Sequence, residues 1–121
     1  MSDQARRLSQ ARLEAPDLLP VECANILWKK VRVRDLTSDD AAARLQFLLR
    51  APVPLAESHP LLDRALGLSF ELRHPVYDCV YLALALRRGV PLVTADKKLA
   101  SVARKSSAAA AHVLLLDDLP E

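Results

Sequence analysis

The longest continuous hydrophobic pattern in the chain lies between His74 and Asp96. Apolar residues occupy most of the helical circumference over residues 76–88, which is typical of a helix packed on more than one side. Gly89 is suited to end this helix, because glycine adopts the left-handed conformation of a helix C-terminus without steric cost. Residues 90–95 then form a short apolar run with the length and branching of a buried parallel strand. The pattern therefore predicts a buried helix followed directly by a buried strand.

The rest of the hydrophobic pattern predicts helices that alternate with short strands. Helices are predicted at residues 2–14, 21–33, 41–49, 60–72 and 96–107, and strands at residues 17–19, 53–56 and 112–116. Pro20 suits the first position of a helix, and Thr37 with Asp40 resembles a capping box. The alternation favours an α/β fold with three layers, in which helices flank a short parallel sheet, and ligands bind such sheets at the carboxyl ends of the strands.

Length and composition predict one domain over residues 1–121, in the cytoplasm and without a membrane span. The chain has no apolar run of about 18 residues and no basic-then-apolar signal peptide. Its two cysteines, Cys23 and Cys79, lack CxxC spacing, which disfavours a zinc site and a structural disulfide. The net charge of +2 does not by itself identify a nucleic-acid binder, although clusters of Lys and Arg flank several acidic residues.

The scarcity of glycine excludes several classes of enzyme. Only Gly67 and Gly89 are present, whereas phosphate-binding loops, dinucleotide-binding turns and the nucleophile elbow of serine hydrolases all require glycine pairs. His59, His74 and His112 are scattered along the chain, and we interpret them as structural or surface residues rather than as a histidine-based site.

Three acidic residues are candidates for a common site. An unpaired carboxylate in the apolar helix is costly, so Asp78 requires a cation, hydrogen-bond donors or an open cleft. Asp96 follows the predicted buried strand, and Glu22 follows the first predicted strand. Each aspartate also has a structural alternative, because Asp78 lies in a first helical turn and Asp96 is placed to cap the helix that begins at Lys97. If the three carboxylates converge at one sheet edge, their oxygen ligands suit Mg²⁺ or Mn²⁺ and favour metal-assisted hydrolysis of phosphodiesters.

Three segments carry candidate site residues in order along the chain: APDLLPVECANILWK with Glu22 and Asn25, HPVYDCVYLALA with Asp78 and Tyr81, and LVTADKKLA with Thr94 and Asp96. Together they resemble the PIN-domain ribonucleases, and specifically the VapC-type toxins of bacterial toxin–antitoxin pairs. The closing VLLLDDLP is similar to the last strand of the family.

The resemblance implies a Mg²⁺- or Mn²⁺-dependent endoribonuclease that cleaves RNA and is inhibited by a cognate antitoxin protein. It also implies that Glu22, Asp78 and Asp96 are the catalytic, metal-binding residues and that Asn25 and Thr94 support them.

The family's first strand, of the form V-x-D-x-S, has no counterpart before the first predicted helix. Two alternatives follow: the chain begins at an internal methionine of a longer gene, or it is a shortened member. In the second case we expect a catalytically degenerate PIN domain that binds an antitoxin or forms oligomers. The apolar residues Ile26, Leu27 and Trp28, together with the absent strand, also predict a homodimer.

Overall fold

The computed structural model describes residues 3–4, 12–105 and 113–116 of the chain. Its elements are β1 (Ala15–Pro16), α2 (Leu19–Arg32), α3 (Ser38–Leu49), β2 (Leu55–Ala56), the 3₁₀ helix η1 (His59–Leu61), α4 (Leu62–Leu72), α5 (Val76–Arg88), β3 (Leu92–Thr94), α6 (Lys97–Ala103) and β4 (Val113–Leu115). Helices alternate with short strands, so the predicted α/β fold class is confirmed. The predicted helix at residues 2–14 falls largely outside the described residues.

The strands pair in parallel, in two separate pairs. β1 pairs with β2, and β3 pairs with β4 in a register that places Val93 opposite Leu114. Within the described ranges no strand joins the two pairs, so they do not form the single sheet that the sequence predicts. Asp17, just after β1, is hydrogen-bonded to Ser58, just after β2. Its Oδ1 accepts hydrogen bonds from the backbone N–H and the hydroxyl of Ser58.

Helix α5 lies in the centre of the hydrophobic core. It buries side chains on several sides, as its sequence predicts, and packs against α4, β1 and β3. The buried residues of this core are Leu61, Ala65, Leu68, Leu72, Cys79, Val80, Leu82, Ala83, Leu84, Ala100, Ala103 and Val113. The helix ends at Gly89 with a φ of 65°, as predicted, because glycine adopts this left-handed conformation at little cost. β3 is only half-buried, so the expectation of a strand covered on both faces is met in part.

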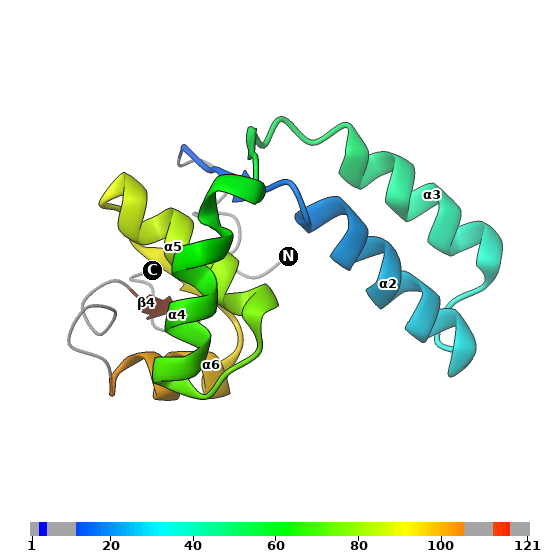
Figure 1. The fold of residues 1–121 in the computed structure, drawn as a ribbon. Helices are drawn as coiled ribbons and strands as arrows, with labels where there is room; N and C mark the ends of the chain where they lie inside the picture. Colours follow the sequence, from blue (N-terminus) through cyan, green and yellow to red (C-terminus); the bar gives the residue numbers. More distant parts are fainter. Residues whose placement is uncertain (1–2, 5–11, 106–112, 117–121) are drawn as a thin grey trace.

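Helices α2 and α3 form a hairpin that projects away from α4, α5 and α6 (Figure 1). We call this hairpin, residues 19–49, the arm, and the remaining described residues from β1 onward the body. The Thr37 hydroxyl accepts a hydrogen bond from the backbone N–H of Asp40 at 3.1 Å, which confirms the predicted cap and starts α3 at Ser38, earlier than predicted.

The arm buries little apolar surface. Leu27 is the buried residue of α2, and α3 has none. Leu48 and Leu49 of α3 are both exposed. An open apolar groove of about 260 Å³ runs between the two helices and is lined in part by Trp28 and Leu45. In the part of the chain that the structure describes, no helix is long and apolar enough to cross a membrane.

Candidate metal centre

The first component of the site is the pair formed by His74 and Asp78. Asp78 lies in the first turn of α5, where the helix dipole favours negative charge, and its side chain is about one-third exposed. Oδ2 of Asp78 lies 2.6 Å from Nε2 of His74, a residue that is only 6% exposed. The hydrogen-bond donor that an Asp78 carboxylate in an apolar helix requires is therefore His74.

Asp96 has the capping role that its sequence position predicts. Oδ1 of Asp96 accepts hydrogen bonds from the backbone N–H groups of Lys98 at 2.9 Å and Leu99 at 3.2 Å, so the residue caps α6. The hydroxyl of Thr94 accepts a hydrogen bond from the backbone N–H of Asp96 at 3.0 Å and thereby shapes the turn between β3 and α6. Both capping bonds end on Oδ1, so the cap leaves Oδ2 of Asp96 open for another contact.

His74, Asp78 and Asp96 come together in one cluster. Each offers one ligand atom, and these three atoms all lie within 4.8 Å of one another. Opposite ligands of an octahedral Mg²⁺ are about 4.2 Å apart, twice the metal–oxygen distance, so the carboxylates of Asp78 and Asp96 lie close enough to share one ion. Two carboxylates with an open solvent side suit Mg²⁺ or Mn²⁺.

His74, which the sequence indicates to be a structural or surface residue, is a member of this cluster. The residue is buried and contacts a site carboxylate. A signal was present in the sequence, because His74 precedes Asp78 by four residues across the start of the predicted helix. Side chains with that spacing meet when the helix begins between them.

Glu22 does not join the three clustered residues and contacts Tyr81 instead. Glu22 lies in the first turn of α2 and accepts a hydrogen bond from the hydroxyl of Tyr81, which lies one turn after Asp78 on α5. Burial raises the pKa of the Tyr81 phenol, and the Glu22 carboxylate raises it further. Tyr81 therefore stays protonated at neutral pH and keeps its hydrogen bond to Glu22. Asn25, one turn further along α2, is exposed.

Residues 2–105 match the family model of the PIN domain. The chain belongs to the PIN-domain family. It is 33% identical over 96 residues to Ribonuclease VapC1 of Mycobacterium tuberculosis, which covers 78% of this chain and 70% of that protein. It is 37% identical over 103 residues to Ribonuclease VapC3 of Pyrobaculum aerophilum, which covers 82% of this chain and 79% of that protein. Ribonuclease VapC12 of Mycobacterium tuberculosis is 37% identical over 99 residues, or 79% of this chain and 73% of that protein. The predicted relationship to VapC-type proteins is confirmed.

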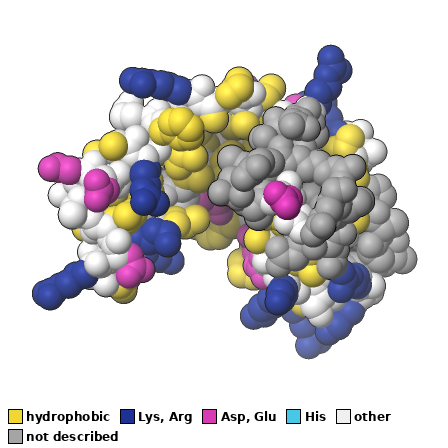
Figure 2. All heavy atoms as spheres, turned by 180° about the vertical axis from the view of Figure 1, so that it is seen from behind, with side chains coloured by type: hydrophobic (Ala, Val, Ile, Leu, Met, Phe, Trp, Pro, Cys, Tyr) yellow, Lys and Arg dark blue, Asp and Glu magenta, His cyan; other side chains and the backbone are white. Residues whose placement is uncertain are grey.

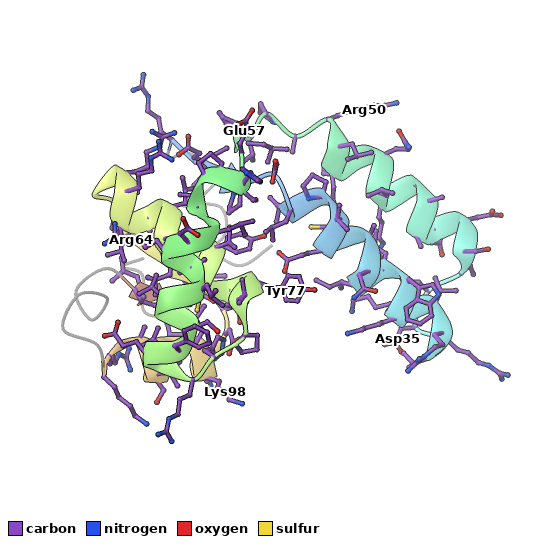
Figure 3. All side chains as sticks on the ribbon, in the orientation of Figure 1. Asp35, Arg50, Glu57, Arg64, Tyr77 and Lys98 are labelled. Carbon is purple, nitrogen blue, oxygen red and sulfur yellow. The ribbon has the colours of Figure 1, made fainter. Side chains whose placement is uncertain are left out.

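In this PIN domain a hollow separates the arm from the body. Hydrophobic and acidic side chains are visible in the hollow, and Lys and Arg side chains stand beside it on the arm (Figure 2). Tyr77, an exposed residue in the first turn of α5, lies on the side of the body that faces the arm (Figure 3). Negative groups inside the hollow and positive groups beside it form an arrangement in which a cation and a polyanion can both be held.

Proposed function

We propose that this PIN domain is a metal-dependent endoribonuclease toxin of a type II toxin–antitoxin system. Its site would hydrolyse RNA phosphodiester bonds with Mg²⁺ or Mn²⁺. The observation that carries the proposal is the convergence of Asp78 and Asp96, together with His74, within 4.8 Å. The relatives named as VapC ribonucleases support the choice of RNA as substrate.

The chain's own residues supply three functions in this proposal. Asp78 and Asp96 hold the cation, which when bound polarises the phosphodiester and favours ionisation of a water molecule. Glu22, fixed by the Tyr81 hydroxyl, adds a further carboxylate. The Lys and Arg side chains beside the hollow contact the RNA backbone, and the exposed ring of Tyr77 offers a surface on which an unpaired base can stack.

The decisive test is Asp78→Asn, assayed on a mixed RNA substrate with Mn²⁺ or with EDTA. The substitution removes the charge and almost no volume, so cleavage is expected to fall to the EDTA background while the circular dichroism spectrum is unchanged. Asp63→Asn is the matched control, because Asp63 also lies in the first turn of a helix, α4, and is exposed. Full activity of the Asp78→Asn protein would contradict the assignment.

A second function, a catalytically degenerate PIN domain that binds an antitoxin, is favoured by one observation. Among the described residues the metal-competent group contains two carboxylates, and Glu22 lies outside it. This alternative predicts that a small antitoxin co-purifies with the chain while metal-dependent cleavage is absent from the antitoxin-free protein. Cleavage that is lost in Asp78→Asn excludes it.

A cognate antitoxin and a second copy of this chain are the proposed protein partners in the cytoplasm. Ile26 and Trp28 are both more than half exposed on the arm, and surfaces of this kind are commonly covered by another chain. The mass of the purified chain in solution, from light scattering, tests the homodimer. A monomeric mass at micromolar concentration would contradict it.

A further inference from the structure

We propose that His74 is a positioning residue, which fixes the Asp78 carboxylate by donating a hydrogen bond from Nε2–H and is not itself a metal ligand. In this arrangement Oδ2 of Asp78 is held by the imidazole, and Oδ1 is left for the cation. The claim that Oδ1 of Asp78 is left for the cation rests on the proposed function. The claim that Nε2–H of His74 donates to Asp78 does not depend on it.

The backbone of His74 is held firmly between two helices. Its N–H donates to the carbonyl of Ser69 at 3.2 Å, and its carbonyl accepts a hydrogen bond from the hydroxyl of Ser69. Arg73 is the C-cap residue of α4 and has a φ of 53°, and Pro75 is the N-cap residue of α5. The chain therefore turns sharply from α4 into α5 at His74, and this turn directs the ring toward Asp78.

The surroundings of the ring select one tautomer. Nδ1 of His74 is buried and has no hydrogen-bond partner among the described residues. A proton on Nδ1 would therefore be a buried donor without an acceptor, which is the less tolerated kind of unsatisfied group. The neutral tautomer with its proton on Nε2 avoids this cost, and Nε2 lies 2.6 Å from its acceptor, Oδ2 of Asp78.

The same observation argues against direct coordination of a metal by His74. To bind a cation, Nε2 must lose its proton, and the proton then resides on Nδ1. Histidines that bind metals almost always donate that second N–H to a carboxylate, a carbonyl or water. His74 has no such acceptor in the described structure, so its contribution is made through Asp78.

Metal affinity in matched variants tests this role. His74→Phe keeps a ring and removes the donor, whereas the side-chain amide of His74→Gln places an N–H close to the position of Nε2. We expect His74→Phe to weaken the binding of Mg²⁺ and Mn²⁺ about 10–100-fold, by the same factor for both ions, as measured by calorimetry. We expect His74→Gln to keep most of the wild-type affinity. His59→Phe, at an exposed histidine, is the control and should change neither affinity.

Two results would overturn the proposal. A loss confined to Mn²⁺ would show direct coordination, because imidazole favours Mn²⁺ over Mg²⁺ as a ligand. Unchanged affinities for both ions, with only a lower melting temperature, would show a purely structural residue. If His74→Phe does not fold, the His74→Gln protein decides, since its affinities must stay close to those of the wild type for both ions.

The ¹⁵N NMR spectrum of the metal-free wild-type chain provides a test that does not depend on the cation. In its neutral form, His74 is expected to carry the proton on Nε2, and a neutral ring with the proton on Nδ1 would refute the proposal. If the wild-type chain binds neither ion, the proposed function fails, whereas the tautomer still decides whether His74 donates to Asp78.

Discussion

Helix α5 in the body and helix α3 in the arm have similar lengths, 13 and 12 residues, yet their environments are opposite. α5 buries Cys79, Leu82 and other residues on several sides, whereas α3 has no buried residue. Helix α5 has ten apolar residues in 13, which surround it, whereas α3 has seven in 12, which form only a stripe. A stripe needs one partner surface, and in this chain α2 covers it only in part.

The arm is therefore the less stable region of the molecule. Isolated helices of its length are marginal in water, so the arm depends on α2–α3 packing at Leu27 and on the hydrogen bond from Tyr81 to Glu22. Segments of low local stability are where proteins commonly place binding surfaces. Asp78 and Asp96 lie in the body, whereas Glu22 lies in the arm.

The largest expected difference between the body and the arm is in the reactivity of their cysteines, because Cys79 lies in α5 and Cys23 in α2. Burial raises the pKa of both thiols, with further increases from Asp78 for Cys79 and from Glu22 for Cys23, so both react faster as pH rises. Cys79 is fully buried and should react only on global unfolding, whereas local opening exposes Cys23. We expect Cys23 to be alkylated by iodoacetamide on the order of 10³ times faster or more, given the usual stability of small domains.

Mass spectrometry of Cys23→Ala and Cys79→Ala proteins, each with one remaining thiol, measures the two rates. Equal rates would mean that the arm and the body open together, and the contrast between them would then fail.

Two leucine-to-alanine substitutions, one in the body and one in the arm, compare the two regions by their effect on the free energy of unfolding. Leu82 is 0% exposed in α5, and Leu82→Ala is expected to cost about 2–5 kcal/mol because it leaves a cavity. Leu48 is 43% exposed in α3, and Leu48→Ala should stay within about 0.5 kcal/mol. Urea denaturation of both variants measures the difference. A cost for Leu48→Ala close to that of Leu82→Ala would show that another chain covers the arm in solution.

The parts of the structure that depend on local pattern could be predicted from the sequence. The bounds of α5, its end at Gly89 and the cap of α3 at Thr37 follow from periodicity and capping chemistry. The need of Asp78 for a partner was also predictable, because it follows from the cost of burying a charge.

The parts that depend on tertiary contacts could not be predicted. The separation of the strands into two pairs, the exposure of Leu48 and Leu49, and the placement of Glu22 beside Tyr81 are set by how the elements dock. The identity of the partner of Asp78 was within reach, but the burial of His74 depends on the turn from α4 into α5, which periodicity does not specify.

The smallest expected effect is at the cap of α3, where the arm's low stability can be measured locally. Thr37→Ala removes the acceptor for the backbone N–H of Asp40 and is expected to cost about 1 kcal/mol. If the arm opens independently, hydrogen exchange should accelerate about fivefold in the amides of α3 and remain unchanged in those of α5, because 1 kcal/mol corresponds to that factor in an opening equilibrium. Ser38→Ala, one residue later and exposed, is the control. Equal acceleration in α5 would show that the arm and the body unfold as one unit, since the lost cap would then lower the stability of both.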